Sequence, residues 1–288
     1  MRGSRLKPGV PWGRIFPLLS PGQLARRYGI ISVSPRFFCE MILSDSFSSF
    51  GRSPTLSTEI EAVRGMLQSV GKVTVFTGAG MSAESGIPTF RGDGGLWRGR
   101  KPEEWATPEA FMQSPEEVRE FYQWRRGIVE EAQPHAGHLA LGRWSSGDSH
   151  HVEIVTQNVD GLHQRSGCSR VWELHGSLWA QHCHDCGTPE SDLGKTHCPC
   201  GGRLRPSVVW FGEGLPSNVW AESERAMRES ELVLVIGTSA VVYPAAGLVG
   251  MAAGVGIPVV EINPQPALDS QTICITGTAA QVLPILLE

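Results

Sequence analysis

The stretch "KVTVFTGAGMSAESGIPTFRG" (residues 72–92) decides the fold that this chain can adopt. Its first part is rich in β-branched residues, which indicates a strand. Small residues follow at once, with Gly78, Gly80 and Ala83 in a G-x-G-x-x-A pattern. At such a turn, backbone N–H groups and a helix N-terminus can approach a pyrophosphate. The pattern predicts a nucleotide site, with a tight strand–helix turn that binds no ligand as the alternative.

The segment after the glycine pattern argues against hydride transfer. In a dehydrogenase, an acidic residue ends the next strand, about 20 residues further on, and holds the ribose. Here the chain runs instead into "TFRGDGGLW" (89–97), a glycine-rich loop. We therefore expect a nucleotide that does not act as a hydride carrier.

Four more segments are rich in β-branched residues and close on small or polar ones: "VEIVTQNVD" (152–160), "RVWELHG" (170–176), "ELVLVIGTS" (231–239) and "GIPVVEINP" (256–264). Helical sequence separates several of them, and a further helix is expected to begin near Ser57, its N-cap. This alternation predicts an α/β fold with a parallel, doubly wound sheet. Ligands of such sheets bind beyond the carboxyl ends of the strands. Residues 98–147, which look helical, and 180–204, rich in Cys, His and Gly, do not fit and are predicted to form a smaller domain.

Charge is distributed unevenly along the 288 residues. Residues 1–39 hold seven basic residues and no acidic one, so the remainder holds 18 basic residues against 29 acidic ones. An acidic body argues against nucleic-acid binding, because phosphate contacts need clustered cations. We expect residues 1–56 to be a basic, disordered extension and the protein to be cytoplasmic. A mitochondrial transit peptide within residues 1–40 is the alternative.

The uncharged run from Leu232 to Val260 is long, but glycine and proline interrupt it. A membrane-spanning helix needs about 20 predominantly apolar residues. We expect a buried strand, a glycine turn, a short helix and a second buried strand within a covered parallel sheet, and no membrane contact.

Four of the seven cysteines lie within eighteen residues: Cys183, Cys186, Cys198 and Cys200. Residues 1–39 lack the apolar segment of a secretory signal, which favours a metal site over disulfides. Two close thiolate pairs suit one tetrahedral, structural Zn²⁺ ion. The second pair is an unusually tight C-x-C, so a histidine is an alternative ligand: His182, His184 or His197. Four bystander thiols are the remaining alternative.

Polar residues at two predicted strand ends are candidates for acid–base chemistry. Gln157, Asn158 and Asp160 end one strand, and His175 ends another. An uncharged histidine can act as a general base near neutral pH. A structural histidine with satisfied hydrogen bonds is the more ordinary interpretation of His175 by itself.

The stretch "EFYQWRRG" (120–127) predicts an amphipathic helix with Tyr122 and Arg125 one turn apart on one face. They are either a tyrosine at the edge of the core beside a solvated arginine, or two donors that share an anionic ligand.

Together these motifs resemble the sirtuin family. They occur in the family's order: "GAGMSAESGIPTFRG", "TQNVDGLH", "ELHGSL", the cysteine pairs, "VVWFGE", "GTS" and "EIN". The resemblance covers Ser57 to Glu288. It implies a Rossmann-like NAD-binding domain made of residues 57–97, 148–179 and 205–288. It also implies a smaller inserted domain, with a helical module (98–147) and a zinc module (180–204), and acyl-lysine side chains of proteins entering the cleft between the domains.

The resemblance implies a role for each matching residue. His175 would be the catalytic base, and Asn158 would position a catalytic water. The NAD site would comprise Gly78, Ala79, Gly80, Ala83, Glu84, Pro88, Thr89, Phe90, Arg91, Gln157, Asn158, Asp160, Gly237, Thr238, Ser239, Asn263 and Ala279. The substrate site would comprise Tyr122, Arg125, Val209, Phe211 and Gly212, with residues 208–213 pairing with the substrate main chain as an added strand. The structural zinc ligands would be Cys183, Cys186, Cys198 and Cys200.

Tyr122 and Arg125 match the Y-x-x-R signature of the sirtuin subgroup that removes acidic acyl groups. The small Ala83 would leave room for such a group. The implied activity is an NAD-dependent protein-lysine deacylase (desuccinylase and demalonylase) that releases nicotinamide and O-acyl-ADP-ribose and accepts acetyl-lysine more weakly. A mono-ADP-ribosyltransferase and a non-catalytic NAD- or ADP-ribose-binding module are the alternatives. We expect a monomer.

Overall fold

The computed structural model describes residues 54–89, 101–268 and 272–288. The predictions for residues 1–53 lie outside these ranges. Helix α3 (Pro54–Gln68) begins at Pro54 rather than near Ser57, so Ser57 lies inside the helix and is not its N-cap. Proline suits the first helical position, where its missing N–H would have no partner within the helix.

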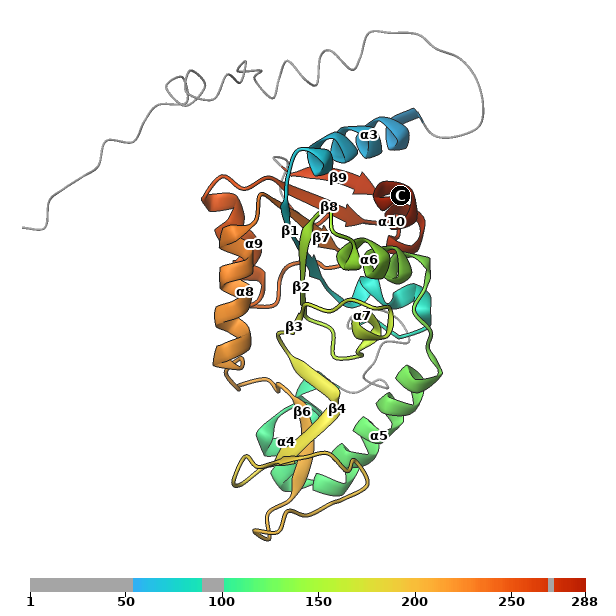
Figure 1. Ribbon diagram of the computed structural model, residues 1–288. Coiled ribbons are helices and arrows are strands. Elements are labelled where there is room, and N and C mark those ends of the chain that lie inside the picture. The colour runs from blue at the N-terminus through green and yellow to red at the C-terminus, as the bar shows by residue number, and fades with distance from the viewer. Residues whose placement is uncertain (1–53, 90–100, 269–271) are drawn as a thin grey trace, which may run out of the picture. The chain divides into compact units, whose positions relative to one another are not determined.

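A six-stranded parallel sheet lies at the centre of the larger region of the described chain (Figure 1), which confirms the predicted α/β fold. The strand order is β3-β2-β1-β7-β8-β9. The strands are β1 (Lys72–Thr77), β2 (His151–Thr156), β3 (Val171–Glu173), β7 (Leu232–Ile236), β8 (Val259–Asn263) and β9 (Ile273–Thr276). Five of them were predicted from the sequence, and the four-residue β9 was not. The order reverses between β1 and β7, and such a switch point is where ligands bind in this class of sheet.

Helices cover both faces of the sheet (Figure 1). Helices α8 (Ser217–Glu229) and α9 (Ala246–Gly254) pack on one face, against Phe76, Val233 and Val235. The opposite face carries α3, α6 (Ala136–Ser146) and α10 (Ala279–Leu287). Because β7 is buried on both faces, all five of its residues are apolar. The run 232–260 thus forms the predicted strand, turn, helix and strand, and no helix in the described part of the chain is long and apolar enough to cross a bilayer.

The smaller region combines helices with an antiparallel sheet of order β5-β4-β6. Its helices are η3 (Pro102–Glu104), α4 (Pro108–Gln113) and α5 (Pro115–Glu131), and its strands are β4 (Gly176–Cys183), β5 (Pro189–Glu190) and β6 (Leu204–Val208). A cluster of buried aromatic residues, including Trp105, Phe121, Tyr122 and Trp210, joins the helices to the sheet. Strands β4 and β6 extend beyond residues 180–204 on both sides, because their pairing reaches Gly176 and Val208. The finer division of the chain into domains stays a prediction.

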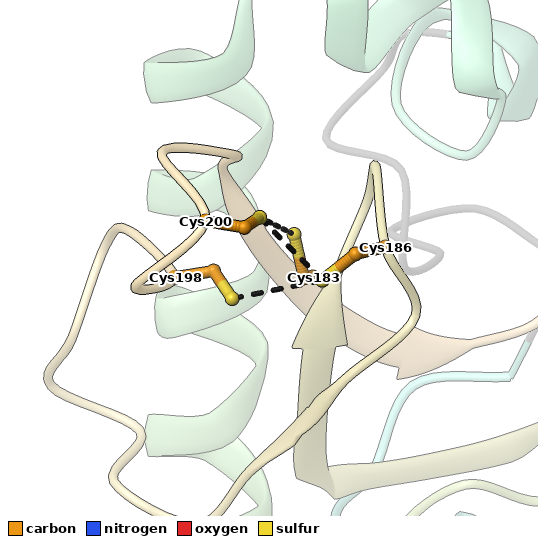
Figure 2. Close-up of side chains that lie close together, drawn as sticks. All are labelled: Cys183, Cys186, Cys198 and Cys200. Carbon is orange, nitrogen blue, oxygen red and sulfur yellow. Dashed lines mark hydrogen bonds between the residues drawn. The ribbon is translucent and has the colours of Figure 1, made fainter.

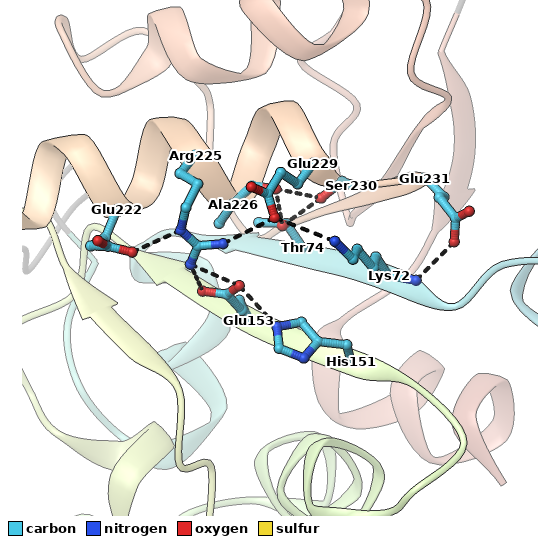
Figure 3. A network of polar contacts seen from close by, with 10 residues as sticks. All are labelled: Lys72, Thr74, His151, Glu153, Glu222, Arg225, Ala226, Glu229, Ser230 and Glu231. Carbon is cyan, nitrogen blue, oxygen red and sulfur yellow. Dashed lines mark hydrogen bonds and ion pairs between the residues drawn. The ribbon is translucent and has the colours of Figure 1, made fainter.

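A polar network ties α8 to the start of the sheet (Figure 3). Glu153 on β2 is buried, and its carboxylate accepts hydrogen bonds from Arg225 (2.9 and 3.0 Å), from Trp172 Nε1 (2.7 Å) and from His151 Nε2 (3.1 Å). Burial raises the pKa of Glu153, but the hydrogen bonds and the Arg225 charge outweigh it and leave the pKa below its ordinary 4.5. The network therefore stabilises the ionised carboxylate.

We expect Glu153→Gln to lower the free energy of unfolding by about 1–3 kcal/mol at pH 7, because it removes the charge from these hydrogen bonds. A group whose folded-state pKa is depressed contributes stability above its unfolded pKa and loses it as the pH falls through the folded value. The difference between variant and wild type should therefore shrink as the pH falls below 4.5. Urea unfolding over a series of pH values measures both effects.

Glu222→Gln is the matched control, since Glu222 also pairs with Arg225 but its side chain is 43% exposed. Exposed pairs contribute less than about 1 kcal/mol. Equal losses in the two variants would contradict the role assigned to Glu153.

Candidate active site and cysteine cluster

Loops from the carboxyl ends of β1, β2 and β7 meet at the switch point of the large sheet. Gln157 Nε2, after β2, donates to Thr238 Oγ1, after β7, over 2.9 Å. Asn158 Nδ2 donates to the carbonyl oxygen of Gly78, after β1, over 3.1 Å. Three segments that are far apart in the sequence, each predicted to bind the nucleotide, therefore share one site.

The glycines at this point allow two loop backbones to touch. Gly78 N donates to Ile236 O (3.1 Å), and Gly80 N donates to Gly237 O (2.8 Å). A Cβ on Gly80 would lie 2.8 Å from Gly237 Cα, and one on Gly237 would lie 2.3 Å from Met81 N. Gly237 also has φ +59°, which disfavours other residues. The close contact thus requires glycine, and in this arrangement both N–H groups are bonded to main-chain carbonyl oxygens.

The segment after Gly78 also differs from a dinucleotide fingerprint in its shape. It forms two short 3₁₀ helices, η1 (Ala79–Met81) and η2 (Ala83–Ser85), where the pattern predicted the N-terminus of a helix. Glu84 Oε2 accepts a hydrogen bond from Ala280 N (2.9 Å), which holds the loop against the start of α10, next to Ala279. Pro88 and Thr89 are the last described residues of the loop, and the predicted site residues Phe90 and Arg91 lie outside the described residues.

Ser82 connects the glycine loop to the polar residues after β2. It is 1% exposed, its Oγ donates to Asp160 Oδ2 (2.8 Å), and it accepts from Asn158 Nδ2 (3.1 Å). Burial raises the pKa of Asp160, against hydrogen bonds from Leu162 and Ser82 that lower it. Ser82 was not among the predicted site residues; the signal available in the sequence was a serine among glycines and alanines.

His175 follows β3 and has a defined tautomer. Its Nδ1 lies 3.0 Å from the carbonyl oxygen of Gln157. A carbonyl only accepts, so Nδ1 carries the proton and Nε2 keeps its lone pair. Burial lowers the pKa of His175 below its ordinary 6.5, although the hydrogen bond to Gln157 opposes the shift. The ring is therefore a neutral base at physiological pH.

The remaining predicted NAD-site residues lie at the end of β8, in the loop after β7 and at the start of α10. Asn263 Nδ2 donates to Thr238 O (3.1 Å) and to Glu261 Oε1 (3.1 Å). Ser239 is exposed beside Thr238, which is buried. Ala279 begins α10 and is 4% exposed, and its carbonyl oxygen lies against Gly137 of α6. These residues lie next to the loops after β1 and β7. The hydrogen bonds that Asn263 donates go to neighbouring residues of this region.

Tyr122 and Arg125 are both buried on α5. Trp210 Nε1 donates to Tyr122 Oη over 2.8 Å. Arg125 is 9% exposed, its Nε has no hydrogen-bond partner, and it makes no ion pair with any of the described residues. Burial lowers the pKa of Arg125 and raises that of Tyr122. The interpretation of Arg125 as a solvated arginine is therefore wrong.

The segment predicted to pair with the substrate lies beside His175. Strand β6 ends at Val208, and then Val209 N donates to His175 O (2.9 Å) and Phe211 N to Ala106 O (2.8 Å). Those two donors are not available to an added strand, so a substrate chain would have to use the other groups of the segment. Phe211 is 40% exposed, and Gly212 has φ +87°.

The four predicted zinc ligands converge (Figure 2): Cys183, Cys186, Cys198 and Cys200, with all sulfur atoms within 4.8 Å of one another. Four thiolates at Zn–S distances of about 2.3 Å need such a spacing, so these residues fit a closed zinc site. Within the described residues, no histidine belongs to this group. His182 Nδ1 instead contacts Ser207 Oγ (2.8 Å), and His184 packs on Phe111.

A cavity of about 560 Å³ lies next to the candidate active site. It is lined by Glu130, Gly161, Gln164, Arg165, Glu173, Ser177 and Trp179. Burial and the charge of Asp160 raise the pKa of Glu173 to about 7, although a hydrogen bond from Gln164 opposes them. None of the predicted site residues lines this cavity.

Comparison with known proteins agrees with this geometry. The Sir2 family model matches residues 78–244, which is more than half of the chain. The chain belongs to the Sir2 family. It is 46% identical over 234 residues to "NAD-dependent protein deacylase 2" of Pyrobaculum aerophilum, covering 78% of this chain and 94% of the relative. It is 43% identical over 231 residues to an NAD-dependent protein deacylase of Mycobacterium tuberculosis, covering 75% of this chain and 97% of the relative.

Solved Sir2 structures share the fold. A Sir2 homolog in complex with NAD superposes with a TM-score of 0.73 at 38% identity, covering 79% of this chain and 92% of the other. A complex of Sir2 with a p53 peptide and NAD⁺ gives a TM-score of 0.69 at 28% identity, over 78% and 95% of the chains. In this Sir2-family chain, Asn263 and Ala279 are the predicted site residues that lie beyond the region matched by the family model.

We expect His175 to be neutral with its proton on Nδ1, and to titrate with a midpoint below 6.5, because burial penalises the imidazolium. Two-dimensional NMR of protein labelled with ¹⁵N-histidine measures the tautomer and the pKa together, and His175→Gln assigns the signal by its disappearance. A midpoint of 6.5 or above, or a proton on Nε2, would show that the ring is not the base described.

Proposed function

We propose that this chain is an NAD-dependent protein-lysine deacylase that prefers acyl groups ending in a carboxylate. The observation that carries the preference is Arg125, a buried guanidinium that makes no direct ion pair among the residues that the structure describes, although the charge of Asp160 acts on its pKa. A buried charge without a directly bonded counter-ion is costly and favours an anionic ligand. The general activity is supported by the names of the relatives and by the tautomer of His175.

The chain's own residues are arranged for acid–base work on a ribose. NAD, when bound, supplies a ribose carbon that releases nicotinamide and takes up the acyl oxygen. His175 accepts a ribose hydroxyl proton at Nε2, and its neutral state avoids repulsion with a developing positive charge. Asn158 donates both amide hydrogens, to Gly78 O and Ser82 Oγ, so its amide oxygen is the group left to accept from a hydroxyl or a water.

Arg125 and Tyr122 form the acyl clamp, a name we keep for this pair. A guanidinium can meet a carboxylate with two parallel hydrogen bonds, and the phenol can add a third. Hydrogen bonds to charged groups contribute roughly 1.5–3 kcal/mol, which corresponds to about 10- to 150-fold in preference. Succinyl-, malonyl- and glutaryl-lysine carry the carboxylate, whereas acetyl-lysine does not. The clamp therefore predicts weaker use of acetyl-lysine.

The cysteine cluster is proposed to hold one structural zinc ion. Four protein ligands would leave no open position for substrate, so the ion would fold the β4–β6 region and take no part in the reaction. The short sheet has few buried apolar residues near the cluster, Leu204 among them, which is consistent with stabilisation by a metal.

We expect Arg125→Met to lower kcat/KM for succinyl- and malonyl-lysine peptides by about 10- to 150-fold. Acetyl-lysine should lose much less, because it has no carboxylate for the guanidinium to bind. Release of nicotinamide and O-acyl-ADP-ribose from NAD is the readout.

Arg119→Met is the matched control for that experiment. Arg119 is on the same helix, but its guanidinium donates to the exposed carbonyl oxygens of Gly194 and Lys195. The acyl clamp would be refuted by equal losses on all three acyl groups in Arg125→Met. Absence of any nicotinamide release with acylated peptides would refute the deacylase itself.

We expect about one zinc ion per chain and its loss in Cys198→Ser. Without the metal, backbone amides between residues 176 and 208 should exchange with solvent faster, because metal binding supplies folding free energy there. Elemental analysis and hydrogen exchange measure the two effects. Cys274→Ser, a half-buried thiol outside the cluster, is the control. Unchanged amide protection in metal-free protein would contradict a structural role.

A further inference from the structure

Trp210 is a fully enclosed aromatic residue beside the acyl clamp. It is 2% exposed and packs on Phe111, with ring centroids 5.4 Å apart, and the Arg205 guanidinium lies 3.2 Å from its ring centroid. Its indole nitrogen donates to Tyr122 Oη over 2.8 Å. The ring is thus held on two sides while its only polar atom contacts the clamp.

The backbone of Trp210 belongs to the segment proposed to bind the substrate main chain. Its N–H donates to Glu213 Oε2 (2.8 Å), and Glu213 is held by Arg205 (3.0 Å). The preceding residue, Val209, donates to the carbonyl oxygen of His175. Trp210 therefore has a fixed position relative to the substrate segment, the base and the clamp.

The hydrogen bond from Trp210 sets the direction of the Tyr122 hydroxyl. An indole N–H can only donate, so Tyr122 Oη must accept from it. A guanidinium also only donates, so the phenol cannot give its proton to Arg125 either. Hydrogen bonds from Trp210 and Arg125 both act to lower the pKa of the phenol, against the larger effect of burial. The phenol keeps its proton, and neither neighbour can accept it.

We propose that Trp210 is a specificity-determining residue, which orients the Tyr122 hydroxyl as a donor to an acyl carboxylate and links the acyl clamp to the substrate segment. This inference rests on the proposed function. It assigns to Trp210 a positioning role through Tyr122 and no contact with the reacting atoms. The competing explanation is that Trp210 only fills the aromatic cluster.

A double-mutant cycle separates the two explanations. Trp210→Phe keeps an aromatic ring over Arg205 and removes the N–H. The ratio of kcat/KM for succinyl-lysine to that for acetyl-lysine should fall by about 2- to 12-fold, the range for one hydrogen bond. In a Tyr122→Phe background, Trp210→Phe should leave the ratio unchanged, because the hydroxyl that it orients is already absent.

Trp105→Phe controls for the loss of a buried indole. Trp105 lies in the same aromatic cluster, where its ring stacks on Phe121 at 4.9 Å. Its substitution should leave the succinyl-to-acetyl ratio unchanged, even if turnover falls for both peptides.

Each outcome bears on one of the two proposals. An unchanged ratio in Trp210→Phe, or the same reduction with and without Tyr122, overturns the role of Trp210 while the clamp stands on Arg125→Met. An unchanged ratio in Arg125→Met overturns the clamp and, with it, the role of Trp210. A fall in the ratio that requires the Tyr122 hydroxyl supports both.

Discussion

The direct contact between the loops that follow β1 and β7 is the constraint on which the candidate active site depends. Gly80 N bonds to Gly237 O over 2.8 Å, and no side chain fits between the two backbones. Because the strand order reverses here, the contact closes the switch point and brings Thr238 within reach of Gln157. The glycine pattern is thus first a packing requirement, and the candidate nucleotide site is formed by that packing.

His175 is hydrogen-bonded to two different parts of the structure, through its side chain and through its main chain. Its Nδ1 is tied to the loop after β2, and its carbonyl oxygen is tied to Val209 after β6. The same residue therefore joins the large parallel sheet to the smaller antiparallel one. This arrangement places a neutral imidazole where the segment proposed to bind the substrate main chain passes beside the candidate nucleotide site.

Burial is the physical basis of the selectivity that we propose for the acyl clamp. In water a guanidinium interacts weakly with most neighbouring groups, because solvent screens its charge. A desolvated guanidinium binds a carboxylate much more strongly than a methyl group. Arg125 is 9% exposed, and aromatic rings at Phe121 and Tyr122 surround it. Its position on an amphipathic helix, beside these two aromatic residues, is visible in the sequence, but its burial is seen only in the folded chain.

Composition and spacing alone determined the parallel α/β sheet, the glycine turn, the cysteine set and the residues at the strand ends, because each is a local pattern. Only the tertiary structure decided what those residues contact. Ser82 and Asn158 are 76 residues apart, and Tyr122 and Trp210 are 88 apart, so no local pattern pairs them. The tautomer of His175, the internal bonding of the glycine N–H groups and the burial of Arg125 likewise arise from long-range packing, which fixes hydrogen-bond partners and excludes water.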